Sequence, residues 1–87
     1  MTDEVDEILK QREGEYGEPK KFFKAYEKIC NELDGYKATS PYKVEGCQKA
    51  IHMIALKTLR LAYDPKHKDS LNDLIGYTKI LKDLANE

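Results

Sequence analysis

The stretch from Lys57 to Tyr77 (KTLRLAYDPKHKDSLNDLIGY) constrains the fold more than any other part of the chain, because it predicts two helices joined by a short turn. Apolar residues recur at three- and four-residue steps up to Asp64-Pro65, where a proline stops the first helix. A second helical pattern begins at Asp69 or Ser70, and either residue type favours the N-cap position. A connection this short favours antiparallel packing of the two helices. The sequence therefore predicts a helical hairpin in its second half.

Three amphipathic patterns precede or belong to this hairpin, at about residues 3–13, 19–33 and 42–63. We expect Gly14 to end the first helix and Asp34-Gly35 to end the second, since glycine favours helix ends. In the third helix the apolar residues form more than one stripe, which predicts a central position. Gly46 in that helix and Gly76 in the fourth suggest close approach of a neighbouring helix. The expected fold is a single all-α domain over residues 1–87, a compact four-helix bundle.

Length and charge limit the classes of function. The 87 residues allow only a modest core, so homodimerisation stays open. Fifteen basic and sixteen acidic residues give a net charge of −1, which disfavours a general affinity for nucleic acid or anionic membranes. The pattern holds neither a membrane-spanning segment nor a signal peptide, which predicts a cytoplasmic protein. A nucleic-acid interface would have to use the lysines of the second helix, Lys20, Lys21, Lys24 and Lys28. The simpler explanation of these lysines is a helix face exposed to solvent.

Four charged residues of the hairpin form the main candidate site. Lys57 and Arg60 lie one turn apart before the Asp64-Pro65 turn, and Asp69 and Asp73 lie one turn apart after it. One interpretation is structural, with Arg60 paired to Asp73 and Lys57 to either aspartate. The other is a polar pocket, in which the cations bind phosphate oxygens and the aspartates bind Mg²⁺ or a ribose hydroxyl. A magnesium site would need further oxygen ligands, so the sequence assigns no metal ligands. A protein-binding surface is a third interpretation.

Tyrosines, one histidine and two cysteines are the other residues considered. Tyr16-Gly17 and Tyr77 could close one side of a pocket by stacking on a base, or could cap the core. The chain has six tyrosines and no tryptophan, and tyrosine is enriched at protein interfaces. We expect His52 to be a surface histidine, because it has no partner at metal-ligand spacing. Cys30 and Cys47 are expected to be reduced, buried thiols.

The same positions resemble a known family. The chain resembles small, all-helical, mostly phage-encoded domains of unknown function, whose signature is a YG turn followed by K-x-x-R and D-S-x-x-D-x-x-G-Y. The matching residues are Arg12, Tyr16-Gly17, Lys57, Arg60, His67, Asp69-Ser70, Asp73 and Gly76-Tyr77. That family is distantly similar to the MazG-like all-α nucleotide pyrophosphohydrolases, which bind Mg²⁺ through an E-E-x-x-E helix and an E-x-x-D helix.

The chain departs from the MazG-like pattern at the metal ligands. It contains no E-E-x-x-E, and its third helix offers only Glu45 near the start. Asp69 and Asp73 correspond at most to the second acidic pair, with a spacing one residue longer. The resemblance therefore implies a helical bundle more directly than it implies hydrolysis, because water activation by Mg²⁺ needs a carboxylate-rich site.

These observations lead to two functional predictions. The first is a small phage-type binding or regulatory protein in the host cytoplasm, without catalytic residues or cofactor, which acts on a host or defence protein or on a nucleotide-like ligand. Its ligand-binding residues would be Arg12, Tyr16, Lys57, Arg60, Asp69, Asp73 and Tyr77. The alternative is a MazG-like, Mg²⁺-dependent nucleoside triphosphate pyrophosphohydrolase. There the two aspartates would bind metal, Lys57 and Arg60 phosphate, and Tyr16 or Tyr77 the base.

Overall fold

The computed structural model describes residues 4–87 and, within the first helix, all side chains except those of Arg12, Glu13, Glu15 and Tyr16. It consists of four α-helices: α1 (Glu4–Tyr16), α2 (Pro19–Lys37), α3 (Cys47–Tyr63) and α4 (Lys68–Ala85). The described part of the chain contains no β-strand. The all-α prediction is confirmed.

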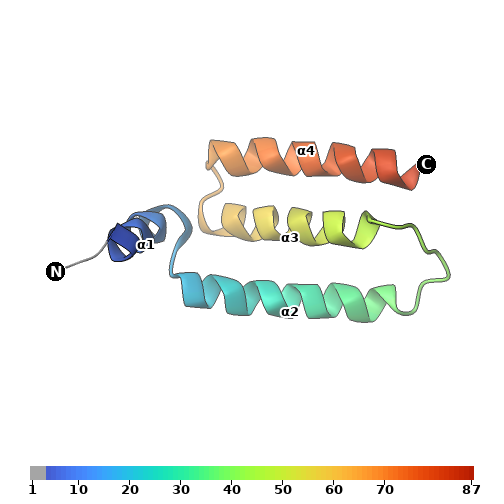
Figure 1. The fold of residues 1–87 in the computed structure, drawn as a ribbon, viewed down its shortest axis with the longest axis horizontal. Coiled ribbons are helices and arrows are strands. Elements are labelled where there is room, and N and C mark those ends of the chain that lie inside the picture. The colour runs from blue at the N-terminus through green and yellow to red at the C-terminus, as the bar shows by residue number, and fades with distance from the viewer. Residues whose placement is uncertain (1–3) are drawn as a thin grey trace.

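Three of the helices lie side by side with alternating directions, and α3 is in the middle (Figure 1). It packs most extensively against α4 and also against α2, while α1 contacts mainly α2. Figure 1 shows α1 at the end of this layer where α2 begins and α3 ends. The central position of the third helix and its antiparallel pairing with the fourth are therefore confirmed.

The turn between α3 and α4 follows the sequence prediction at its start. Asp64 is the C-cap of α3, and its backbone N–H donates to the carbonyl oxygen of Arg60 at 3.0 Å. The Asp64 carboxylate accepts a hydrogen bond from the backbone N–H of Lys66, also at 3.0 Å. Because Pro65 has no N–H to continue the helical pattern, this local network ends α3 and reverses the chain.

Two predicted helix ends are wrong, because the glycines that were expected to mark them have ordinary helical backbone. α1 continues through Gly14 to Tyr16, and the residue with a positive φ is Gly17, at 83°. α2 continues through Gly35 to Lys37 and closes when Ala38 donates its N–H to the carbonyl of Asp34. A glycine ends a helix only where the chain uses its left-handed conformation.

The predicted start of the third helix is also wrong. Residues 42–46 form a loop, in which the Ser40 hydroxyl accepts from the backbone N–H of Tyr42 and the Lys37 ammonium donates to the Tyr42 carbonyl. Gly46 has a φ of 86° and is the N-cap of α3 rather than a residue inside it. A residue with this φ cannot continue a right-handed helix, so α3 begins at Cys47. Gly76 does lie inside α4. Nothing lies within 4 Å of a Cβ built on it, so no neighbouring helix approaches α4 closely there.

The N-cap of α4 is His67, not Asp69 or Ser70. Its Nδ1 accepts the backbone N–H of Ser70 at 3.2 Å and lies 2.8 Å from the Ser70 hydroxyl. The imidazole thus takes the role that a serine or aspartate oxygen usually has at this position. Ser70 lies in the first turn of α4 with its side chain buried, at 1% exposure.

Burial is sparse for a folded chain. Among the residues whose burial is described, the buried ones are Ala50, His52, Lys57 and Ser70. Three of these four are polar or charged, and α2 has no buried residue. Within residues 4–87, no helix has the length and apolarity required to cross a membrane. The layer therefore places its best-protected positions along α3, with much of the apolar surface of the other helices exposed.

Candidate functional site

The predicted charge cluster contains one ion pair between α3 and α4. The Lys57 ammonium lies 2.9 Å from a carboxylate oxygen of Asp73. Lys57 is buried, with 11% of its side chain exposed, whereas half of the Asp73 side chain faces solvent. A buried ammonium needs a partner charge, and Asp73 supplies it from the opposite helix. The pair therefore links α3 to α4 across the hairpin.

Arg60 joins α3 to α2 instead of completing this cluster. Its guanidinium carbon lies 5.5 Å from the centroid of the Phe22 ring, within the range of a cation–π contact. The Phe22 ring also stacks on Tyr26, with centroids 6.5 Å apart and an interplanar angle of 7°. The expected ion pair between Arg60 and Asp73 does not form, since the carboxylate is engaged by Lys57.

The remaining predicted ligand residues are dispersed. Asp69 is exposed in the first turn of α4, and it forms no ion pair with any described cation. Tyr77 is half-buried and lines a small groove of about 270 Å³ with its α4 neighbours Asn72, Asp73, Gly76 and Ile80. The predicted site residues Arg12 and Tyr16 lie outside the described side chains. The structure thus brings together Lys57 and Asp73, places Tyr77 beside Asp73, and leaves Asp69 apart.

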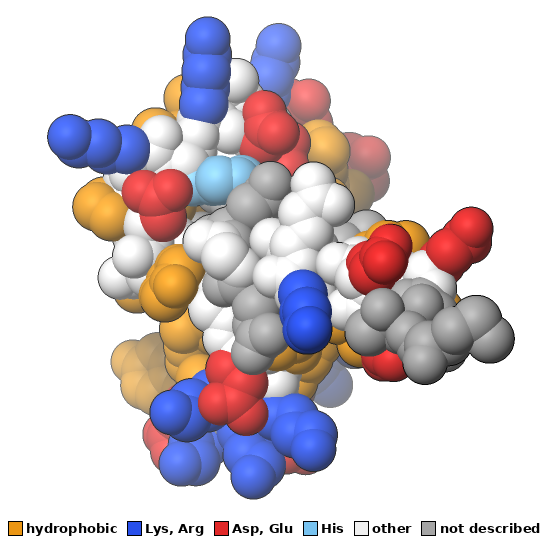
Figure 2. All heavy atoms as spheres, turned by 90° about the vertical axis from the view of Figure 1, so that its left-hand side faces the viewer, with side chains coloured by type: hydrophobic (Ala, Val, Ile, Leu, Met, Phe, Trp, Pro, Cys, Tyr) orange, Lys and Arg blue, Asp and Glu red, His pale blue; other side chains and the backbone are white. Residues whose placement is uncertain are grey.

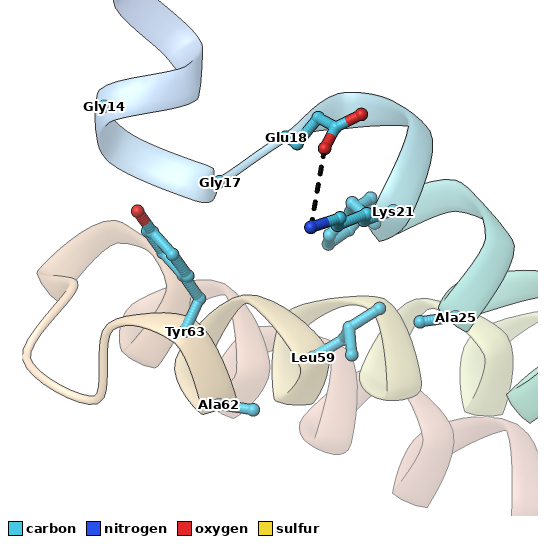
Figure 3. Close-up of a pocket in the computed structure, with 9 residues that line it drawn as sticks. Gly14, Gly17, Glu18, Lys21, Ala25, Leu59, Ala62 and Tyr63 are labelled. Atoms are coloured by element: carbon cyan, nitrogen blue, oxygen red, sulfur yellow. Dashed lines mark ion pairs between the residues drawn. The ribbon is translucent and has the colours of Figure 1, made fainter.

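A groove lies at the turn between α1 and α2, away from that ion pair. It has a volume of about 700 Å³ and is lined by Gly14, Gly17, Glu18, Lys21, Phe22, Ala25, Leu59, Ala62 and Tyr63. Figure 3 shows the Tyr63 ring rising from the end of α3 toward Gly17, and the Lys21 ammonium reaching toward Glu18. That ion pair is long, at 3.8 Å, and exposed. We call this feature the α1–α3 groove.

Gly17 allows Tyr63 to sit against the backbone of this turn. A Cβ on Gly17 would lie 3.2 Å from Cε2 and 3.3 Å from Cδ2 of the Tyr63 ring. The positive φ of Gly17 also disfavours any side chain there. The ring that lies against Gly17 is thus Tyr63, from the end of α3.

Sequence reasoning missed a polar cluster between α2 and α3. The Asp34 carboxylate accepts hydrogen bonds from Gln48 Nε2 at 2.9 Å and from His52 Nε2 at 2.6 Å. His52 is buried, so its prediction as a surface histidine is wrong. The Gln48 and His52 hydrogen bonds hold the pKa of Asp34 below its usual value. No local pattern links residues 14 and 18 positions apart, so only the packing of α2 on α3 reveals this cluster.

The described residues do not fit the magnesium site of the alternative prediction. Nowhere among them do three His, Cys, Asp or Glu side chains come together as a metal would require. Asp73, one of the two aspartates predicted to bind the metal, is paired with Lys57. Mg²⁺ takes six oxygen ligands, several of them carboxylates or water, and the described residues near Asp73 do not supply such a set.

Other chemistry-bearing residues are exposed or weakly protected. Figure 2 shows lysine and arginine side chains gathered at the foot of the view, on the side of the molecule where α2 lies. The exposed lysines of that helix are Lys20, Lys21, Lys24 and Lys28. They are accessible to a nucleic acid, and binding of one stays a prediction. Cys30 and Cys47 are free thiols, as expected, but they are half-buried rather than buried.

The fold and these sites define a small all-α domain in which ion-paired and hydrogen-bonded side chains link the helices of one layer, and in which a groove lies beside the YG turn. The sequence pattern of DUF6378, described as a domain of unknown function, matches residues 1–85, and the chain belongs to that family. Neither a curated protein nor a solved structure was found to be similar to it.

Proposed function

We propose that this chain is a non-catalytic binding protein that acts by contact with another protein. One observation carries the proposal: the chain exposes 7073 Å² of surface. A folded monomer of its mass, 10.1 kDa, exposes about 5,300 Å². The excess of roughly 1,800 Å² is surface that a self-contained domain would bury. Its radius of gyration, 15.4 Å, likewise exceeds the value of about 12 Å for a compact chain of this length.

Large apolar side chains contribute to the exposed surface. Among the residues whose burial is described, eleven large hydrophobic ones are more than two-fifths exposed: Val5, Ile8, Leu9, Phe23, Tyr36, Tyr42, Val44, Tyr63, Leu71, Ile75 and Ile80. Scattered exposed hydrophobics are ordinary, but a contiguous set marks an interaction surface. On α1, Val5, Ile8 and Leu9 follow the spacing of one helical face, and all three are exposed. We call these three residues the α1 stripe. It fits a partner that offers a complementary apolar groove or helix.

The resemblance to phage-encoded domains makes a host or defence protein the partner that we propose. A nucleotide-like ligand receives less support, because the Lys57 charge that would bind phosphate is already neutralised by Asp73. The MazG-like hydrolase is the least supported of the three, since Asp69 and Asp73 are not joined by other described carboxylates.

Affinity capture with matched variants tests the protein-binding proposal. Tagged wild type, incubated with extract of the host cell, should retain a defined protein. Ile8→Asp should reduce its recovery at least tenfold, because a buried charge without a partner opposes an apolar contact. Lys10→Gln makes the same change of charge at an exposed position outside the α1 stripe and should retain the partner. Equal loss in both variants, or no specific retention by wild type, contradicts the proposal.

A nucleotide screen tests the competing ligands. Thermal unfolding is followed with and without Mg²⁺ across nucleoside mono-, di- and triphosphates, since a ligand that binds only the folded state raises the midpoint. We expect no shift and no release of pyrophosphate. A shift that Arg60→Ala abolishes would establish the nucleotide-like ligand instead, and pyrophosphate release that Asp73→Ala abolishes would establish the hydrolase.

A further inference from the structure

The apolar side of α2 is only partly covered by the rest of the layer. Its large apolar residues recur at three- and four-residue steps, yet none of them is buried: Phe22, Phe23, Tyr26, Ile29, Cys30 and Leu33. The helix that packs most extensively against α2 is α3, and it covers one part of this stripe. The other part forms a shallow groove of about 460 Å³ lined by Phe23, Lys24, Tyr26, Glu27 and Cys30. We call these five residues the α2 face.

Phe23 gives this face its strongest apolar contribution. Its side chain is 61% exposed and meets Phe22 edge to ring, with centroids 5.4 Å apart. An aromatic ring that is supported on one side and open on the other is typical of an interface anchor. Desolvation raises the pKa of the neighbouring Tyr26, with a further contribution from its hydrogen bond with Cys30.

Charge along α2 points to a particular occupant. Residues 19–26 contain three lysines and no acid, whereas residues 27–33 contain Glu27 and Glu32 against one lysine. The next residue, Asp34, is engaged by Gln48 and His52 of α3. An identical helix running antiparallel would place each basic half beside an acidic half. A parallel copy would place like charges together, which is unfavourable. Antiparallel pairing is also the arrangement that a two-fold axis across the helix generates, and two-fold dimers are the commonest oligomers.

The excess surface of the whole chain is large enough to include such an interface. A standard interface buries about 800 Å² per partner, and obligate homodimers bury about 1,000 Å² or more. The excess of roughly 1,800 Å² per chain exceeds both values. An interface on the α2 face would still leave surface for another protein.

We propose that a second copy of this chain occupies the α2 face, with the two α2 helices antiparallel across a two-fold axis. This inference rests on the proposed function, because it names one partner for the exposed surface. The α1 stripe and the α1–α3 groove are made of other residues, so the dimer presents each of them twice. A bivalent assembly binds a repeated or oligomeric target more tightly than one chain does.

The first test is the mass in solution of the full chain, measured by light scattering or sedimentation over about a hundredfold range of concentration. Wild type should show twice the chain mass of 10.1 kDa. Phe23→Asp should raise the dimer dissociation constant at least a hundredfold. Ile75→Asp, a matched change at an exposed position on α4, should leave it unchanged. A monomeric wild type, or dissociation caused by Ile75→Asp alone, overturns the proposal.

Charge reversal tests the orientation and does not depend on the folding of the Phe23 variant. Lys20→Glu with Lys24→Glu should weaken the dimer at low salt, because acidic halves would then meet acidic halves. Adding Glu27→Lys and Glu32→Lys to the same chain should restore it. Absence of rescue rules out the antiparallel pairing.

The same variants separate this inference from the proposed function. If wild type is monomeric but still retains a host protein through the α1 stripe, the dimer is wrong and the binding function stands. If wild type is a dimer and retains nothing, the dimer stands and the binding function is wrong. Retention lost in Phe23→Asp with a monomeric wild type would assign the α2 face to the other protein.

Discussion

At the level of single residues, the contact between Lys57 and Asp73 allows a structural role to be distinguished from a role in ligand binding. Their 2.9 Å ion pair crosses from α3 to α4, with the ammonium buried and the carboxylate half-exposed. Removal of one partner from a buried pair leaves an unsatisfied charge, which costs more than the pair contributes. A residue kept for a ligand would instead cost little stability when it is replaced. Stability measurements can therefore assign the pair.

We expect Asp73→Ala to lower the free energy of unfolding by about 1–3 kcal/mol, a value below that of a fully buried pair because the carboxylate is half-exposed. Urea denaturation at a fixed protein concentration measures the change. Asp69→Ala is the matched control, one turn away and without an ion pair to any described cation. Asp69→Ala should cost less than about 1 kcal/mol, because it removes only the favourable interaction of a carboxylate with the helix N-terminus. Equal costs for the two variants would mean that the Lys57 pair is not structural.

The cluster of Asp34, Gln48 and His52 is the corresponding contact between α2 and α3. Two hydrogen bonds lower the pKa of the Asp34 carboxyl in the folded chain, whereas in the unfolded chain it keeps the ordinary value of about 3.9. A lowered pKa means that the folded state favours the charged carboxylate. Its contribution to stability is therefore complete well above pH 4 and disappears as the pH falls through the lowered pKa.

Asp34→Asn should reveal this dependence. The variant should be less stable than wild type near neutral pH, and the difference should shrink as the pH falls below about 4, where the wild-type carboxyl also becomes neutral. Urea midpoints at neutral and acid pH give the comparison, with Asp83→Asn as a control at an exposed position on α4. A difference that stays constant across this range would show that the charge of Asp34 does not stabilise the fold.

At the element scale, the turn between α1 and α2 sets where α1 meets the layer. Gly17 makes the turn possible with a φ of 83°, and the ring of Tyr63 lies where its side chain would be. Gly14, only three residues earlier, lies within α1 and has open space around its Cα. The two glycines of the G-E-Y-G segment therefore have opposite physical roles.

Alanine substitutions should separate these roles. Gly17→Ala should lower stability by about 1–2 kcal/mol, because a left-handed conformation is unfavourable for alanine and its Cβ would press on Tyr63. Gly14→Ala should raise stability by about 0.5–1 kcal/mol through helix propensity. Circular dichroism during thermal unfolding measures both. Destabilisation by Gly14→Ala would show that something packs closely on that side of α1.

At the scale of the whole molecule, the chain exposes roughly 1,800 Å² more surface than a compact monomer of its mass. Four described residues are buried, and three of them are polar or charged. Hydrophobic burial is the dominant favourable term in folding, so a chain with this little burial gains most from an interface. Folding and self-association should therefore be linked.

Linkage of this kind makes the melting temperature depend on protein concentration. For a dimer of two 87-residue chains, a tenfold rise in concentration should raise the midpoint by roughly 3–5 °C. Differential scanning calorimetry at several concentrations gives the slope, and Phe23→Asp should abolish it. A midpoint that is independent of concentration in wild type would indicate a monomer.

The extent of prediction differs between the fold and the site. Periodicity fixed the number and class of the helices, and the Asp64-Pro65 signal fixed the end of α3. Glycines misplaced three boundaries, because a glycine shows only that a positive φ is permitted; Gly14 and Gly35 did not use it and Gly46 did. The His67 cap was missed because an imidazole is an uncommon acceptor at an N-cap.

By itself, then, the sequence determined the helices, the central position of α3 and the antiparallel hairpin, since these depend on local propensity, apolar spacing and a short turn. Only the tertiary structure decided which charges meet: Lys57 with Asp73, Arg60 over Phe22, and Asp34 with His52. Only it revealed that α2 stays without a buried residue. Contacts between helices depend on rotation and register along each axis, and neither quantity is encoded in the spacing of residues within one helix.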